Sequence, residues 1–420
     1  MNRRARPGTD APDPPDRSSA APSSPSASLT APIAAHTLGR FVTNIAIRFV
    51  YSFLPVLARG LGTSVGTLGI VLSARDLTGL TSPLVGRHVD RGHTRGWLLG
   101  ALGATAVASL VCTVGGLWGF AIGQLVIGAA AATFVVANTT WIGHRVPFRQ
   151  RGRAIAVVEL SWAVALLAGV PVLGLLIDGW GPVAGWGWRS PFLAVALASV
   201  AAMVVVARVL PVESPPAPQP GAPSAPATDG AGPPPERPER TWPLVGGVAL
   251  MAFGMQQAMV IHAAWLEDEI GLSVAGLGVV AFVLGGFELV GSGANALASD
   301  RIGKRRSALA GIFPLIVVLA VLPLLPTIPW MAVAALGCGV LLFEFSFVAT
   351  LPLLTELDPA APARALGRAL AVMTVARAIG TVVATTAYEL SGITGPAVIG
   401  AFMTALAAAC FVAGVREPAS

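Results

Sequence analysis

The fold is decided by two similar basic stretches, SPLVGRHVDRGHTR at residues 82–95 and NALASDRIGKRRSAL at residues 295–309. Their aspartates, Asp90 and Asp300, lie 210 positions apart. A second pair, RGRAIAV at 151–157 and LGRALAV at 366–372, repeats at a nearly equal offset of 215. Two matches at almost one offset indicate a duplicated chain, and parallel duplicated halves are typical of membrane proteins that move solutes.

Apolar stretches of about 20 residues surround these segments, each long enough to cross ~30 Å of hydrocarbon. The chain is 54% hydrophobic and 11% charged, with a mean hydropathy of +0.73. Soluble domains carry roughly 25% charged residues, so lipid must cover this surface. We predict an all-α membrane protein with 12 transmembrane helices in two six-helix pseudo-symmetric bundles. The expected spans are 36–58, 65–87, 96–116, 118–141, 153–176, 190–210, 242–265, 273–298, 307–326, 329–352, 366–389 and 393–414.

Two segments differ from the apolar background. Residues 1–32 are rich in Pro, Ser and Ala and predict a disordered cytoplasmic tail. Residues 211–240 contain eleven prolines and predict an extended linker, also cytoplasmic. The expected bundles are then residues 33–210 and 241–415.

The distribution of basic residues predicts the orientation in the membrane. With the amino terminus inside, 21 of the 27 Lys and Arg residues fall in inside segments, and only Arg59 and Arg189 fall outside. This bias predicts a multi-pass protein of the plasma (inner) membrane with both termini in the cytoplasm. The net charge of +6 therefore marks orientation in a lipid bilayer, and we expect no nucleic-acid partner.

The two basic stretches resemble the loop motif of the major facilitator superfamily, G-x-x-x-D-[RK]-x-G-[RK]-[RK], which follows spans 2 and 8. In the first copy the glycine Gly92 stands one place early, and in the second Ala296 replaces the leading glycine. The resemblance implies a conformational gate, in which Asp90 contacts the start of span 11 and Asp300 the start of span 5. Ordinary loop charges are the alternative interpretation. The matching residues are Gly86, Asp90, Arg91, Arg95, Asp300, Arg301, Gly303, Lys304 and Arg305.

Further segments resemble efflux members of this superfamily, the drug:proton antiporters. Gly169, Pro171 and Gly174 in span 5 fit either their Gly- and Pro-rich fifth span or plain close packing of helices. Gln124 stands in span 4 where those antiporters carry an arginine, which departs from their proton mechanism. GWGWRSPF at 185–192 resembles a segment before their span 6, although its tryptophans also fit an interfacial belt.

Ionisable and amide residues inside the spans are the candidate site, because a charge at mid-bilayer costs at least ~2.5–3.5 kcal/mol. Asp76 and Glu288 lie about 21 Å and 18 Å from the basic loops at 1.5 Å per residue. We expect a proton or substrate cavity containing Arg48, Asp76, Gln124, Gln257, Glu288, Glu344 and Arg377. A buried carboxyl group can exchange a proton near neutral pH, which makes Asp76, Glu288 and Glu344 candidate carriers.

The alternative is that these charges only lock helices together, with Arg48 bound to Asp76 or Arg377 bound to Glu159. Arg75 and Asp76 lie about 100° apart on a helix, so we expect only one of them to face the cavity.

Other function classes fit less well. The five histidines show no metal-ligand spacing and no nucleophile motif occurs, so we expect no enzyme, no metal and no cofactor. A channel normally assembles from symmetric subunits, whereas this chain contains its own duplication. The resemblance implies a monomeric secondary transporter of a small-molecule substrate, with proton-coupled efflux preferred. Proton-coupled uptake of a sugar or organic anion, and a non-transporting sensor of the same fold, remain open.

Overall fold

The computed structural model describes residues 29–89, 93–181, 185–211, 238–325, 328–357 and 362–414. Residues 1–28 of the expected tail and 212–237 of the expected linker lie outside the described residues, and helices begin at Thr30 and at Pro238, inside the bounds expected for these segments. The described part is helical and contains no strand. The first-half helices are α1 (Thr30–Ser52), α2 (Leu54–Leu61), α3 (Val65–Leu77), α4 (Ser82–Val89), α5 (Thr94–Cys112), α6 (Gly116–Arg145), α7 (Phe148–Val164), α8 (Val170–Ile177) and α9 (Ser190–Val209). The second-half helices are α10 (Pro238–Asp268), α11 (Val274–Ile302), α12 (Lys304–Val321), α13 (Pro329–Thr355), α14 (Pro362–Ser391) and α15 (Thr394–Gly414).

The number of spans follows from these helices. Within the described ranges, ten helices are long and apolar enough to cross a membrane, and the pair α1 and α2, bent by 76°, makes eleven. The remaining expected span, 65–87, is broken into α3, a 3-10 turn at Thr78–Thr81 and α4, so it forms no single long helix. The predicted all-helical membrane fold is confirmed, and these segments are consistent with its twelve spans.

Prolines explain where two spans are interrupted. Pro55 stands in the first turn of α2, and α1 ends three residues before it at Ser52, because proline lacks the N–H donor and its ring clashes with the carbonyl four residues earlier. Pro171 stands in the first turn of α8, after a wide π-type turn at Ala165–Gly169. Both interruptions lie in helices of the first half.

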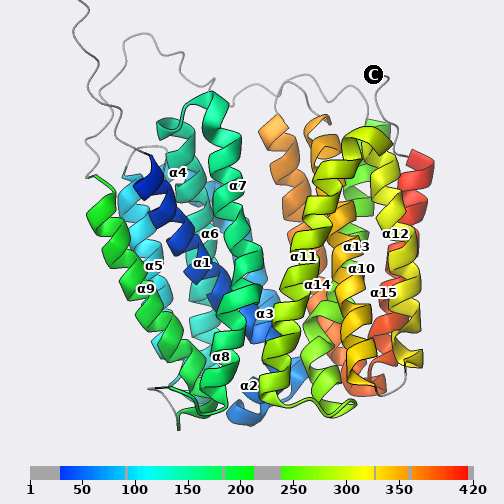
Figure 1. Ribbon diagram of the computed structural model, residues 1–420, viewed down its shortest axis with the longest axis horizontal. Helices are drawn as coiled ribbons and strands as arrows, with labels where there is room; N and C mark the ends of the chain where they lie inside the picture. Colours follow the sequence, from blue (N-terminus) through cyan, green and yellow to red (C-terminus); the bar gives the residue numbers. More distant parts are fainter. Residues whose placement is uncertain are drawn as a thin grey trace, which may run out of the picture.

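The two halves stand side by side, with α1–α9 in one group and α10–α15 in the other (Figure 1). Their most extensive mutual contacts join α3 to α14 and α8 to α11. These are spans 2 with 11 and 5 with 8, which are equivalent pairs under the duplication. The interface therefore has the pseudo-symmetry that the repeated sequence predicts.

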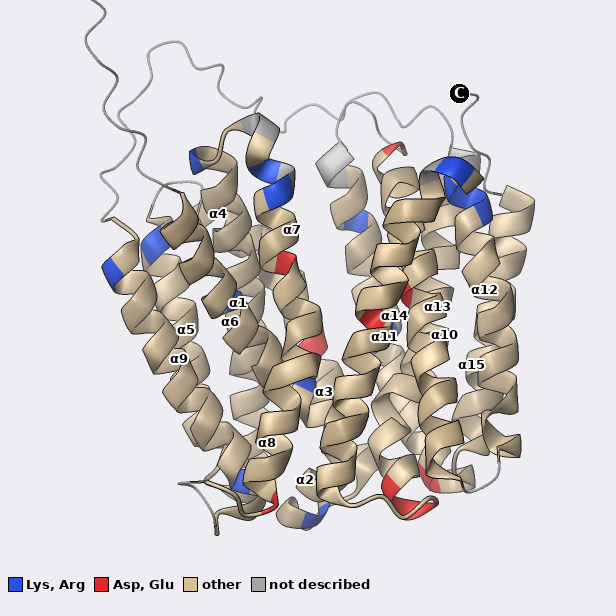
Figure 2. Cartoon of the chain, viewed as in Figure 1, with Lys and Arg blue, Asp and Glu red and all other residues tan. Residues whose placement is uncertain are grey.

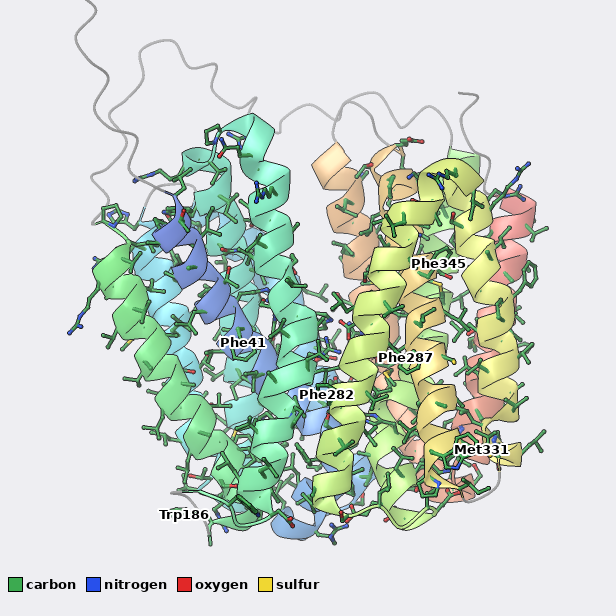
Figure 3. All side chains as sticks on the ribbon, in the orientation of Figure 1. Phe41, Trp186, Phe282, Phe287, Met331 and Phe345 are labelled. Carbon is green, nitrogen blue, oxygen red and sulfur yellow. The ribbon has the colours of Figure 1, made fainter. Side chains whose placement is uncertain are left out.

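The two ends of the molecule differ in charge. Lys and Arg residues gather at the end where α7 and α12 begin, whereas acidic residues gather at the opposite end (Figure 2). We call that opposite end the closed end, because polar contacts join the halves there: Arg59 pairs with Glu267 at 2.6 Å, and Gly66 N–H donates to Glu389 at 2.6 Å. Trp186 lies at this same end in Figure 3 and is 54% exposed.

The central cavity as candidate functional site

A cavity of about 540 Å³ lies between the halves. Residues of α1, α3, α6 and α7 line it from the first half, and residues of α10, α11, α13 and α14 from the second. Its size falls in the range that holds a drug-sized molecule. Five predicted site residues line it: Arg48, Asp76, Glu288, Glu344 and Arg377.

Arg48 and Glu288 form an ion pair that crosses between the halves. Arg48 Nη1 donates to Glu288 Oε1 at 3.0 Å and Nη2 to Oε2 at 2.6 Å, a two-point pairing of guanidinium and carboxylate. Arg48 also lies over the Trp162 ring at 4.3 Å and donates to the Trp162 carbonyl. Both charged side chains are largely buried, at 14% and 6% exposure. The pair therefore links α1 to α11 inside the cavity.

A second charge cluster belongs to the first half alone. Arg75 donates to Asp76 Oδ1 at 2.9 Å through Nη2 and at 3.1 Å through Nε. Arg75 Nη1 donates to Gln124 Oε1 and to the Ile47 carbonyl, and the Tyr51 hydroxyl donates to Asp76 Oδ2 at 2.8 Å. The Arg75 side chain is fully buried, so each of its three guanidinium nitrogens depends on these partners.

Three sequence expectations about this region are wrong. Both Arg75 and Asp76 reach the cavity, because the long arginine side chain curves back to its neighbour. The predicted pairs Arg48–Asp76 and Arg377–Glu159 do not form. Glu159 instead faces Arg40 at 3.5 Å. Partner choice depends on how helices pack, which spacing along one helix does not report.

The expected amides Gln124 and Gln257 do not line the cavity. Gln124 is fully buried behind it, where it accepts from Arg75 and donates to the Cys112 sulfur. Gln257 is also fully buried and donates to the Gly380 carbonyl at 3.0 Å, joining α10 to α14. Gln256, the residue before Gln257 on α10, lines the cavity. Helix rotation decided between adjacent residues that the sequence alone could not separate.

Glu344 and Arg377, on the second-half wall, are less fully engaged. Glu344 Oε2 accepts one long hydrogen bond, 3.4 Å, from the Ser292 hydroxyl. Arg377 Nε donates to Gln256 Oε1 at 3.2 Å. Among the residues that the structure describes, neither side chain has an ion-pair partner within 4.0 Å. The second half therefore carries one carboxyl group and one guanidinium group available inside the cavity.

The site predicted from the sequence did not include the apolar residues that line the cavity. Met255 and Met259 of α10, and Phe343 and Phe347 of α13, line the cavity, and the two phenylalanine rings stack at 5.8 Å. Members of each pair are four residues apart, a spacing that places them on one helix face. That spacing was the available signal, but it is common among lipid-facing residues too.

The small residues of span 5 lie at close contacts between helices. A Cβ atom on Gly174 would meet the Phe53 ring at 3.0 Å and Gly278 Cα of α11 at 3.5 Å. A Cβ atom on Gly169 would collide with Ile45 of α1. Pro171 faces the same glycine of α11, at 3.5 Å from the Cβ position of Gly278.

The gate motif lies mostly at the edge of the described structure. Asp90 and Arg91, and the side chain of Asp300, lie outside the described residues. Arg95 donates to the Ala207 carbonyl at 2.6 Å, and Arg305 donates to the carbonyls of Phe411 and Val412. The remaining members are Gly86, the exposed Arg301, Gly303 with φ +92° at the end of α11, and Lys304, which donates to Ser299 at 3.1 Å.

Comparison with known proteins decides the family. The family model described as Major Facilitator Superfamily matches residues 37–385. This chain belongs to the Major Facilitator Superfamily. The family and the fold indicate a membrane transporter and not a catalytic enzyme. Among the described residues, no cluster of three or more His, Cys, Asp or Glu side chains could hold a metal ion.

Relatives within the superfamily vary in how much they share with this chain. It is 31% identical over 377 residues to a chloramphenicol resistance protein of Streptomyces lividans, covering 84% of this chain and 88% of the relative. It is 29% identical over 154 residues to the uncharacterized MFS-type transporter YwfA of Bacillus subtilis (strain 168), 36% of either chain.

Solved transporters share the fold at low identity. A D-xylose-proton symporter matches with a TM-score of 0.72 at 15% identity, covering 93% of this chain and 99% of that one. A bacterial homologue of the human lysosomal transporter Spinster, in an inward-facing and occupied conformation, matches with a TM-score of 0.69 at 15% identity, covering 91% and 94%.

Proposed function

We propose that this superfamily member exports a small organic solute from the cytoplasm in exchange for protons. It does so as a monomer in the plasma (inner) membrane, by alternating exposure of the central cavity. One observation carries the proposal: the Arg48–Glu288 pair joins the two halves inside the cavity, next to a second carboxyl group without a cationic partner. Such a pair must be broken or rearranged when the halves rock, so a proton that neutralises a carboxylate can control the switch.

The proposed orientation places the basic end in the cytoplasm, together with both termini. The closed end, with Arg59–Glu267 and Gly66–Glu389, then faces outward. The structure would correspond to a state with its cavity directed to the cytoplasm, from which an exporter loads its solute. In the opposite state, Asp90 and Asp300 would hold the cytoplasmic side shut against the starts of spans 11 and 5.

The proposed coupling uses two neighbouring carboxyl groups, of which only Glu288 has a cationic partner. Glu344 lies on α13 where α13 packs against α11, the helix of Glu288, and the Cβ position of Gly291 lies 3.1 Å from Glu344 Cβ. Glu288 already pairs with Arg48, whereas Glu344 accepts only the hydrogen bond from Ser292, so Glu344 can take up a proton without the loss of an ion pair. We therefore assign Glu344 as the proton carrier and Glu288 as the group that transmits the change to Arg48. Asp76, held by Arg75 and Tyr51, is assigned a structural role.

Export is supported by the chloramphenicol resistance protein, the relative that aligns over most of both chains. Removal of the compound from the cell is the way in which a transporter confers such resistance. The xylose-proton symporter supports the shared fold alone at its 15% identity.

The test is flux through purified protein in liposomes. With chloramphenicol as the probe, an imposed pH gradient is expected to drive its movement against the proton flow. Glu344→Gln is expected to abolish the gradient-driven part and to preserve exchange of probe for probe, which needs no net proton movement. Glu356→Gln, the same change at an exposed residue at the end of α13, is the matched control. Equal flux with and without the gradient, or unaltered coupling in Glu344→Gln, would contradict the proposal.

A further inference from the structure

The guanidinium of Arg377 differs from the other arginines at the centre of the cavity. Arg48 uses both terminal nitrogens on Glu288, and Arg75 uses both on Asp76, Gln124 and Ile47. Arg377 has one hydrogen bond, from Nε to Gln256. Within the described part of the chain, its two terminal nitrogens have no hydrogen-bond partner. They form a free pair of donors in a lined cavity.

The structure also holds this side chain in one orientation. Gln256 Oε1 accepts from Arg377 Nε at 3.2 Å, and Gln256 Nε2 donates to the Thr381 hydroxyl at 2.9 Å. The Thr381 hydroxyl in turn donates to the Arg377 carbonyl at 3.0 Å, one turn away on α14. This closed ring of contacts fixes the guanidinium through its inner nitrogen and leaves the outer fork free. An oriented fork binds a planar two-oxygen group more strongly than a flexible ammonium group does.

The cavity that contains this guanidinium also has apolar lining residues from both halves. On the second-half side lie Met255, Phe343 and Met373, which are large, soft and able to adapt. On the first-half side α6 presents Ala131 and Ala132, whose side chains are small, whereas Thr78 and Arg75 fill the space beside Gly128. An aromatic ring can bury a large apolar area against such residues.

Most charged groups of the cavity already have a partner of opposite charge. Three carboxylates already face an arginine, as Glu288 with Arg48, Asp76 with Arg75 and Glu159 with Arg40. Under the proposed function the fourth, Glu344, takes up the coupling proton. His262 also lines the cavity and points its Nδ1 at the Met259 carbonyl at 2.7 Å. The group left to recognise a ligand is then the positive fork of Arg377.

We propose that the substrates are aromatic molecules whose polar end carries oxygen acceptors, such as a carboxylate, and that this end docks on the outer nitrogens of Arg377. The ring lies against the apolar lining residues of α10, α13 and α14. This inference rests on the proposed function for the use of the cavity, but it concerns the class of substrate and not the direction or the coupling.

The experiment compares two probes that differ only in the head group: 2-naphthoate and 2-naphthylmethylammonium. Binding to the purified full chain is measured by calorimetry. We expect 2-naphthoate to bind at least about tenfold more tightly, because hydrogen bonds between charged groups dominate the difference. Arg377→Gln is expected to remove that preference, and Arg377→Lys to restore only part of it, since an ammonium lacks the fork. Arg306→Gln, an equal change of charge at an exposed residue, is the control and is expected to bind as the unaltered protein does.

Two results would overturn the inference. One is that the ammonium probe binds as tightly as 2-naphthoate or more tightly. The other is that a folded Arg377→Gln variant binds 2-naphthoate with unchanged affinity. If that variant does not fold, the ranking of the two probes on the unaltered protein and on Arg377→Lys decides. Phe343→Ala is expected to weaken both probes to the same extent, because it removes only the stacking surface. These binding results do not depend on gradient-driven flux, which tests the proposed function. The substrate class can therefore be wrong while the flux experiment still supports the proposed function.

Discussion

The two walls of the cavity treat charge differently. On the first-half wall Arg75, Asp76, Tyr51 and Gln124 form a network in which each charged group has its partner. On the second-half wall Glu344 and Arg377 lie in the same cavity without ion-pair partners among the described residues. A paired, buried network resists change, whereas unpaired groups can exchange a proton or bind a ligand. The two halves have similar sequence motifs, yet their charged side chains are paired on one wall of the cavity and partly unpaired on the other.

The largest expected effect breaks the first-half network. Asp76→Ala would leave the fully buried Arg75 without its counter-ion, and the loss of one partner from a buried pair costs about 3–5 kcal/mol. We expect a large drop in the thermal unfolding temperature and in the yield of folded protein. Glu356→Ala, at an exposed site, is the control. If Asp76→Ala were as stable as the control, the contrast between the two walls would be wrong.

The link between the walls gives the next effect. Arg48→Gln and Glu288→Gln are each expected to slow transport at least about tenfold, because each leaves a charge without its partner across the interface. The double variant is expected to regain stability relative to the sum of the single changes, with a coupling of about 1–3 kcal/mol. A double-mutant cycle of unfolding free energies measures this coupling. Strict additivity would show that the pair does not hold the halves together.

A smaller effect is expected at the closed end, where Glu389 accepts from Gly66 N–H at the start of α3. Glu389→Gln removes the charge from that hydrogen bond and should weaken it by about 1 kcal/mol. The halves should then separate more often at this end. Spin labels at Trp180 and Leu390, which are both exposed, would then show an increased population of long label-to-label distances. An unchanged distance distribution would mean that other contacts seal this end.

The smallest effect sharpens the role of Gln256. Gln256→Leu keeps the size of the side chain but removes its hydrogen bonds to Arg377 and Thr381. The guanidinium then loses its fixed orientation, and we expect 2-naphthoate to bind about three- to tenfold more weakly, which corresponds to one neutral hydrogen bond. Cys338→Ser, at an exposed position, should leave the affinity unchanged. A Gln256→Leu affinity equal to that of the control would leave the fork without a positioning residue.

Much of the fold could be predicted because the bilayer imposes lengths that show in a single sequence. A run of about 20 apolar residues can be recognised as a membrane span in any sequence, and the repeated segments around Asp90 and Asp300 indicated the duplication. The candidate residues were also found by a local rule, since a charge within an apolar run is conspicuous. Arg48, Asp76, Glu288, Glu344 and Arg377 all line the cavity. The same rule failed for uncharged residues such as Gln257, because an amide is tolerated in packing between helices and in cavities alike.

A helical membrane protein with two similar halves, with ionisable residues inside its apolar spans, can be read directly from the order of residues. That Arg48 binds Glu288 across the halves, that Arg75 turns back to Asp76, and that Arg377 keeps its outer nitrogens free became apparent from the packed helices alone. The physical reason is one of range. Transfer of a residue into lipid is a property of that residue and its neighbours in the chain, whereas an ion pair depends on the rotation and approach of helices that lie up to 240 positions apart.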